Sequence, residues 1–252
     1  MFLGLKGKKA LITGSSRGIG RAIAMELSKA GVEIAIHCAS RIDEAETLKE
    51  EIEKNGGKCC IIEEDLCRDD CAEVIAAAIE KEMGHVDILV LNASMQYRKS
   101  WEEITLEEFD NQVFCNLRAS LLLMQKLVPA MRENQWGRVI TIGSIHEAKP
   151  NPDMLIYAAT KTAQTTMAKS LSKQLAKDGV TVNSVAPGVI TTDRNAKSLS
   201  NPEWRATVMA RVPMGYFGKP VDIAGTVMLL CSEQGRYITG QNIYIDGGMS
   251  AL

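Results

Sequence analysis

The chain has 252 residues, and its 29 basic and 31 acidic side chains give a formal net charge of -2. This charge provides no general attraction to nucleic acid or to anionic membranes. A chain of this length can bury a sufficient core as one unit, so we expect a single domain over residues 1–252. No stretch reaches the roughly 18 apolar residues that span a bilayer, and the first residues lack the pattern of a signal peptide. We therefore expect a cytoplasmic protein whose partner is a small molecule.

The seven cysteines contain no CxxC pair of the kind that binds zinc or exchanges disulfides. Cys67 and Cys71 are one helical turn apart, but two soft ligands without a neighbouring histidine rarely hold a metal. We expect reduced thiols and no metal site.

Short runs rich in β-branched residues alternate with helix-length segments along the whole chain. The runs predicted as strands are residues 9–13, 32–37, 58–63, 86–91, 137–142, 180–185 and 242–246. The clearest predicted helices are residues 42–55, 103–132 and 154–178. This alternation predicts an α/β fold, a Rossmann-type doubly wound parallel sheet of about seven strands with helices on both faces. The less regular residues 189–219 predict a substrate loop over a site.

A glycine-rich turn follows the first predicted strand and precedes a helix. Glycine permits a tight turn and close backbone approach, so that amide groups at the helix N-terminus can bind a pyrophosphate. The residues expected to bind it are Gly14, Ser16, Arg17, Gly18, Ile19 and Gly20. Their spacing is GxxxGxG rather than GxGxxG, so the prediction depends on the flanking strand and helix.

Two further strand ends fall at the same edge of the sheet. They are Asp65-Leu66 and Asn92-Ala93, and both are expected to contact the dinucleotide. Asp65 either accepts a hydrogen bond from an adenine amino group or caps a helix.

The end of the second strand predicts a preference for NADP(H), with NAD(H) still usable. NAD enzymes usually place an acidic side chain there, whereas this chain has no carboxylate between residue 37 and Asp43. Arg17 and Arg41 supply positive charge, and Ser40 a hydroxyl, for a 2′-phosphate. The alternative is that both arginines are ordinary solvated loop residues.

Ser144, Tyr157 and Lys161 form the candidate catalytic centre. Tyr157 and Lys161 are four residues apart and share one face of a predicted helix, while Ser144 follows a strand. An ammonium about 4 Å from a phenol contributes roughly 4 kcal/mol, enough to lower the phenol pKa by up to about three units. Tyr157 is then expected to exchange a proton with the substrate while Ser144 holds its oxygen.

The chain resembles the short-chain dehydrogenase/reductase family, in its simple branch of about 250 residues. The resemblance covers the whole chain and depends on several motifs at the expected separations. They are TGSSRGIG at 13–20, Asp65, Asn92-Ala93, Asn116, Ser144 thirteen residues before Tyr157, Lys161, PGVITT at 187–192 and ITGQNIYIDGG at 238–248.

The resemblance implies an oxidoreductase that transfers a hydride between NADP(H) and a carbonyl or secondary alcohol. It implies that Asn116 kinks its helix and supports a water-linked proton relay through Lys161, which also binds the nicotinamide ribose. It implies contacts to the nicotinamide end from Pro187, Gly188, Ile190 and Thr192, and a homotetramer or homodimer. Leu91 and Ser94 depart from the family's usual NNAG, so a local adjustment is expected beside the coenzyme.

The substrate is the least determined feature. Gln96, Arg98, Ser144 and Arg194 are expected to line the pocket, and their polarity favours a sugar, polyol or sugar acid. A 3-oxoacyl thioester is the alternative. Two other functions are alternatives. One is a hydrolase that pairs Ser144 with His146, although the sequence lacks a GxSxG elbow there, and the other is a dinucleotide-binding sensor or scaffold without catalysis.

Overall fold

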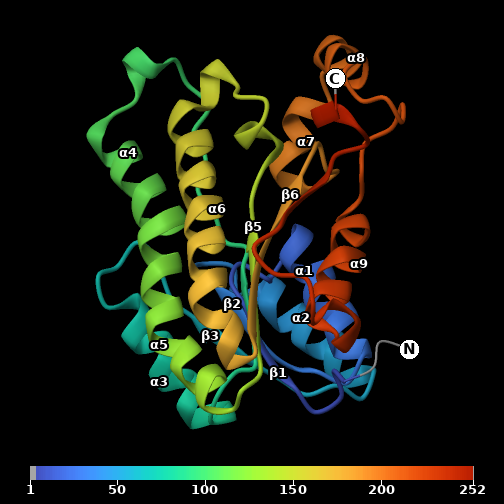
Figure 1. Cartoon of the computed structure of the whole chain (residues 1–252). Helices are drawn as coiled ribbons and strands as arrows, with labels where there is room; N and C mark the ends of the chain where they lie inside the picture. The colour runs from blue at the N-terminus through green and yellow to red at the C-terminus, as the bar shows by residue number, and fades with distance from the viewer. Residues whose placement is uncertain (1–3, 252) are drawn as a thin grey trace.

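The structure, a computed structural model, describes residues 4–251 (Figure 1). Their strands form one parallel sheet in the order β3-β2-β1-β4-β5-β6-β7. The strands are β1 (Lys9–Ile12), β2 (Glu33–Cys38), β3 (Cys59–Glu63), β4 (Ile88–Leu91), β5 (Gly137–Ile142), β6 (Val180–Pro187) and β7 (Asn242–Ile245). The predicted fold class is confirmed.

Helices cover both faces of this sheet, with α1, α2 and α9 on one side and α3, α5 and α6 on the other (Figure 1). The helices are α1 (Gly18–Lys29), α2 (Ile42–Lys54), α3 (Cys71–Met83), α4 (Leu106–Val113), α5 (Ala119–Glu133), α6 (Leu155–Leu175), α7 (Asp193–Leu199), α8 (Pro202–Met209) and α9 (Pro220–Cys231). Among residues 4–251, no helix combines the length and apolarity needed to cross a membrane.

The strand sequences explain the two layers. In β1, Ala10 and Ile12 pack against the side of α1 and α9, and Leu11 packs against the side of α3 and α5. Successive strand residues point to opposite faces, so a strand covered on both sides must be apolar throughout. The same holds for β4, in which every residue is buried.

The predicted helix over residues 103–132 is divided in the structure. Thr105 begins α4 through a capping box with Glu108, so the preceding Trp101–Glu103 is a separate 3-10 turn. Between α4 and α5, Phe114–Arg118 forms one turn of π-helix. The predicted helix 154–178 is observed as α6 followed by a 3-10 turn, and it ends at Gly179 with φ of 73°.

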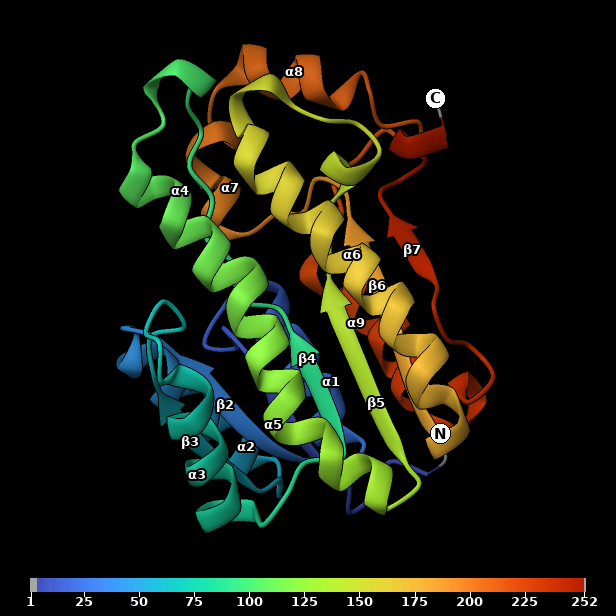
Figure 2. The ribbon, with the colours of Figure 1, turned by 60° about the vertical axis from the view of Figure 1, so that its left-hand side comes forward.

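The strand order reverses at β1. From β1 the chain first builds the sheet outward through β2 and β3, and then returns to add β4 on the other side of β1. Crossovers on the two sides of this point run to opposite faces, which leaves a crevice at the carboxyl ends of the strands. The helices α7 and α8 lie beyond those ends (Figure 2). The fold therefore directs ligands to this edge.

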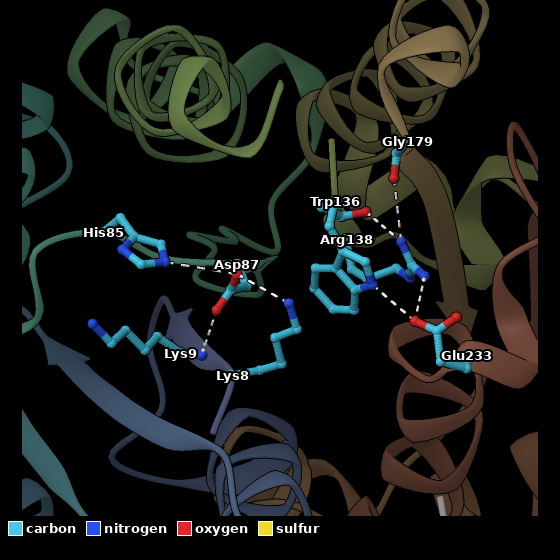
Figure 3. Close-up of polar contacts among 9 residues, drawn as sticks. Lys8, Lys9, His85, Asp87, Trp136, Arg138, Gly179 and Glu233 are labelled. Atoms are coloured by element: carbon cyan, nitrogen blue, oxygen red, sulfur yellow. Dashed lines mark hydrogen bonds and ion pairs between the residues drawn. The ribbon is translucent and has the colours of Figure 1, made fainter. Parts of the chain in front are cut away.

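A polar cluster around Asp87 lies at the opposite end of the strands, where β1 and β4 begin (Figure 3). The Asp87 carboxylate accepts a hydrogen bond from the backbone of Lys9 at 2.9 Å and pairs with the Lys8 ammonium at 3.5 Å. His85 lies 3.7 Å from the same carboxylate. These contacts fasten the start of β1 to the start of β4.

Arg138 is 2% exposed in the same region, at the start of β5. Its guanidinium donates to the carbonyls of Gly137 and Gly179 at 2.8 and 3.4 Å and lies 4.3 Å from the Trp136 ring centroid. Glu233 pairs with it at 3.7 Å and accepts the indole N–H at 2.8 Å (Figure 3). Burial lowers the pKa of Arg138, because removing the guanidinium from water destabilises its charged form.

Candidate active site

A cavity of about 1300 Å³ opens at the carboxyl edge of the sheet, and residues from α7 and α8 form part of its wall. Most predicted site residues meet around it. Those that line it are Gly14, Ser16, Arg17, Gly18, Ile19, Ser40, Arg41, Asp65, Leu66, Asn92, Ala93, Gln96, Arg98, Ser144, Tyr157, Lys161, Pro187, Gly188, Ile190, Thr192 and Arg194. Gly20 and Asn116 are predicted site residues that are buried outside this lining.

The glycine turn has the shape that phosphate binding requires. Gly14 and Gly18 have φ of 63° and 59°, a region that side chains disfavour. A Cβ on Gly20 would lie 2.5 Å from both the Asn92 amide and the Gly14 carbonyl. Asn92 holds the turn by donating to the carbonyls of Thr13 and Gly14 at 2.8 and 2.9 Å. This backbone cradle at the start of α1 fits a dinucleotide pyrophosphate.

His37 supports the turn from β2, a role that the sequence argument did not foresee. Its Nδ1 accepts the Gly14 N–H at 3.0 Å, and its backbone N–H donates to Ser15 Oγ at 3.0 Å. The side chain is 1% exposed, and burial lowers its pKa to about 4, so the imidazole is neutral and can accept. The only sequence signal is a polar residue within a buried strand next to a glycine turn.

The adenosine end differs from expectation in one respect. Glu44, in the first turn of α2, pairs with Arg41 at 2.8 Å and lies 4.0 Å from the Arg17 Nε. A carboxylate is therefore present beside the two arginines, although none lies between residue 37 and Asp43 in the sequence, because the first turn of α2 brings Glu44 back toward the end of β2. The two arginines still outnumber this carboxylate, and Ser40 lines the same wall.

Asp65 lies on the cavity wall, and its Oδ1 accepts the Cys67 N–H at 2.9 Å. It therefore closes a local turn. The N-cap of α3 is Asp70, so capping of that helix does not explain Asp65.

Ser144 is fixed by a half-buried carboxylate. Glu147 accepts the Ser144 backbone N–H at 2.8 Å with one oxygen and the Asn242 amide of β7 at 2.9 Å with the other. Burial raises the pKa of Glu147. The spacing S-x-x-E at 144–147 is a capping-box signature, so the contact of Glu147 with Ser144 could have been predicted from the sequence.

Tyr157 and Lys161 lie on one face of α6, with the ammonium 5.9 Å from the ring centroid. The expected lowering of the Tyr157 pKa by Lys161 is wrong for this structure. Burial raises the pKa of Tyr157, and the cation that opposes this rise is Arg194. Burial also lowers the pKa of Lys161 to about 8. Desolvation outweighs mutual attraction because both groups are enclosed.

A hydrogen-bonded chain connects these residues to the π-helical turn. The Lys161 ammonium donates to the Ile142 carbonyl at 2.7 Å and to Gln164 at 3.2 Å. The Asn116 amide donates to Met95 O and Thr160 Oγ1 at 2.9 and 3.0 Å, and Thr160 in turn donates to the Tyr157 carbonyl at 2.8 Å. Asn116 thus ties three elements together from within the π-helical turn, which lies where the resemblance implies a kink.

Ser94, one of the two departures from the family's usual NNAG, contacts the segment 189–219 that was predicted to form a substrate loop. Arg194 of α7 donates to the Ser94 hydroxyl at 2.9 Å and to its carbonyl at 2.7 Å. Arg98 lies 5.7 Å from the Trp204 ring centroid of α8. Leu91, the other departure, is a core residue at 2% exposure.

The hydrolase alternative finds no support in this geometry. His146 approaches Ser144 only through its backbone N–H, 3.2 Å from Oγ, while its ring Nδ1 lies 3.0 Å from the Lys149 carbonyl. The imidazole is therefore not placed to take the Ser144 proton.

Comparisons with known proteins identify the family of the chain. The family model described as enoyl-(acyl carrier protein) reductase matches residues 14–250. The 3-oxoacyl-[acyl-carrier-protein] reductase FabG of Staphylococcus epidermidis is 36% identical over 242 residues, which are 96% of this chain and 98% of the relative.

Solved structures give the same result. A proposed NAD(P)-dependent gluconate 5-dehydrogenase of Beutenbergia cavernae, with bound NADP, has a TM-score of 0.94 at 31% identity and covers 100% of both chains. A 3-oxoacyl (acyl-carrier-protein) reductase of Agrobacterium tumefaciens C58, with NADP bound, has a TM-score of 0.92 at 35% identity and covers 98% of this chain and 95% of that one. The chain belongs to the short-chain dehydrogenase/reductase family of oxidoreductases, which act on hydroxyl and carbonyl groups.

Proposed function

We propose that the protein interconverts a carbonyl and a secondary alcohol of a sugar acid or related hydroxy acid with NADP(H). The observation that carries this proposal is the convergence of Ser144, Tyr157 and Lys161 with the glycine turn on one cavity. A bound dinucleotide would supply the hydride in reduction and accept it in oxidation. The residues of the chain bind and orient the two ligands and exchange the proton.

Tyr157 is the proposed proton donor and acceptor. Because burial raises its pKa, the phenol holds its proton at neutral pH and is ready to donate it to the oxygen of a carbonyl undergoing reduction. In the oxidative direction it takes that proton back. Ser144 orients the same oxygen by a hydrogen bond, and Glu147 fixes the backbone that carries Ser144.

Lys161 and Asn116 have supporting roles in the proposal. Lys161 holds positive charge beside Tyr157 and is the group expected to bind the nicotinamide ribose. Asn116 secures the backbone at Met95 and the hydroxyl of Thr160, and so supports the proposed proton relay. The loop from Pro187 to Thr192 forms the wall expected at the nicotinamide end.

NADP(H) is the proposed coenzyme because Arg17, Arg41 and Ser40 line the cavity near the end of β2. Several similar structures contain NADP or NADPH, which supports the preference. The measurement is the ratio of kcat/KM for NADPH to that for NADH. We expect a ratio of roughly a hundred, because two charge-assisted hydrogen bonds act on the phosphate. A ratio at or below unity would contradict it.

The proposed substrate class depends on the cationic wall beyond Tyr157. Arg98 and Arg194 line the cavity together with Gln96, which suits a hydroxylated carboxylate better than an aliphatic chain. A 3-oxoacyl thioester remains the second candidate, because the curated relative FabG is a reductase of that substrate class by name.

A spectrophotometric screen separates these candidates. Purified enzyme and NADPH are offered keto-sugars, keto forms of sugar acids and a 3-oxoacyl thioester, with the Tyr157→Phe variant as the blank. Turnover of the sugar-acid group supports the proposal. Turnover of the thioester alone would show that the second candidate is right.

A homo-oligomer, expected to be a tetramer, is part of the proposal. Leu121 of α5 and Phe109 of α4 are each 41% exposed, and Leu155 of α6 is 49% exposed. Large apolar side chains on neighbouring helices favour burial against a second copy.

A further inference from the structure

Ser94 stands where the family usually has glycine, and its hydroxyl makes a hydrogen bond that glycine could not make. That hydroxyl accepts a hydrogen bond from Arg194 at 2.9 Å, and the Ser94 carbonyl accepts a second one at 2.7 Å. These bonds join the end of β4 to α7, two segments that are 100 residues apart in the chain. A glycine would retain the carbonyl bond and lose the other.

The same pair stands beside the proton donor. The Ser94 side chain and the charge of Arg194 both act to lower the pKa of Tyr157, and so favour its phenolate. The other groups that face this phenol are the Ser144 hydroxyl, the Glu147 carboxylate, Lys161 at 5.9 Å and His146, whose ring centroid is 6.5 Å away. Arg194 is therefore a cation close to the reacting end of the cavity.

The Arg194 guanidinium retains donors for a ligand. A guanidinium carries five N–H groups, and the two bonds to Ser94 use one on each terminal nitrogen. Arg194 lines the cavity, and its side chain remains exposed there. A carboxylate is the ligand that matches such a planar fork.

We propose that Ser94 is a positioning residue that fixes Arg194 beside Tyr157, and that the fixed guanidinium binds the carboxylate of a hydroxy-acid substrate. This inference rests on the proposed function and deepens it. Ser94 would explain selectivity for an acid over the corresponding neutral polyol, because the serine restricts an otherwise mobile side chain to one place.

The test compares gluconate with sorbitol, which carries a CH2OH group in place of the carboxylate. Oxidation of each by NADP+ is followed in the wild type, Ser94→Ala, Ser94→Thr, Arg194→Met and the double variant Ser94→Ala/Arg194→Met. Arg205→Met is the matched control, since its guanidinium lies 5.5 Å from the Phe217 ring centroid of this loop region and does not line the cavity.

We expect the wild type to favour gluconate in kcat/KM. Ser94→Ala should reduce this preference roughly 3- to 10-fold, the effect of one hydrogen bond to a charged group at a partly exposed site. Arg194→Met should remove most of it, and the double variant should lose no more than Arg194→Met alone because the two residues act together. Ser94→Thr and Arg205→Met should retain the wild-type preference.

Two further readouts separate positioning from a general loss of structure. The pH profile of gluconate oxidation should move to higher pH in Ser94→Ala and Arg194→Met, because each change removes a group that favours the phenolate. Binding of gluconate to the enzyme–NADPH complex, followed by NADPH fluorescence, should weaken in the same variants while NADPH binding itself is unchanged.

The outcomes are distinguishable. Gluconate binding that depends on Ser94, without any turnover, would overturn the proposed reaction and leave the positioning role intact. A Ser94→Ala variant with wild-type selectivity and an unmoved pH profile would overturn the inference, as would a wild type that binds gluconate no better than sorbitol.

Discussion

Replacing Lys161 by Met should abolish turnover and yet stabilise the protein at neutral pH. Burial lowers the pKa of Lys161 to about 8 from the ordinary value of 10.5, so the charged side chain costs about 3 kcal/mol of folding free energy at pH 7. Methionine removes this cost but leaves Ile142 O and Gln164 without their donor, which costs roughly 1–2 kcal/mol. The expected net gain is about 1–2 kcal/mol.

The pH dependence of the stability difference between the wild type and Lys161→Met tests whether the buried charge of Lys161 causes it. Lys161 is a base whose folded-state pKa is depressed, so between about 8 and 10.5 the unfolded chain binds more protons than the folded one. Wild-type stability therefore rises with pH in this window relative to the variant. Below pH 8 the difference between the two proteins is nearly constant. By pH 9.5 it should have moved by about 2 kcal/mol in favour of the wild type, which leaves the two proteins about equally stable or the wild type slightly more stable.

Urea unfolding followed by tryptophan fluorescence at pH 7 and pH 9.5 measures both quantities. Titrations of groups remote from Lys161 occur in both proteins and cancel in the difference. Cys115, whose pKa is lowered in part by Lys161, is replaced by alanine in both proteins so that it does not contribute. A variant that is less stable than the wild type at pH 7, or a difference that does not change with pH, would refute the account of Lys161 as a costly buried charge.

Three other predictions concern separate parts of the molecule. Tyr157→Phe should reduce kcat by at least about a thousandfold while NADPH still binds, since only the proton transfer is lost; comparable turnover in the variant would exclude the proposed donor. Gly20→Ala should raise the KM for NADPH and NADH alike, because its Cβ would displace Asn92 and the Gly14 carbonyl; an unchanged KM for both would argue against the glycine cradle. Light scattering at micromolar concentration should show a homo-oligomer, and a stable monomer would contradict the interface expected at Leu121.

The sheet and its covering helices could be predicted because the signals are local. Strands buried on both faces need continuous apolar runs, and the helix over 154–178 carries its own end signal at Gly179. The lower boundary of the helix over 103–132 was misplaced, although T-x-x-E at 105–108 marks the start observed in the structure. Apolar periodicity alone does not reveal this start, because the cap depends on the polar side chains of Thr105 and Glu108.

Most of the residues predicted for the site line one cavity, but the direction of the Tyr157 pKa shift was predicted wrongly. The spacing of Tyr157 and Lys161 shows that they share a helix face, whereas their pKa values depend on how completely other segments enclose them. The pairings of Arg194 with Ser94 and of Glu44 with Arg41 likewise depend on where loops and helix turns meet in space. Sequence distance carries no information about such meetings.

The π-helical turn at Phe114–Arg118 amounts to one residue inserted into an otherwise α-helical segment. One extra residue rotates everything beyond it by about 100° around the helix axis. Deleting a residue there would restore regular α-helical bonding, but it would turn either Asn116 or the apolar face of α5 away from its partners. An ideal α-helix here could not direct both Asn116 and the apolar face of α5 toward their partners. Packing on both sides of the turn therefore maintains the π-helical geometry. We expect backbone amides in this turn to exchange with solvent faster than those of α5, because the helix is weakest where Asn116 is held.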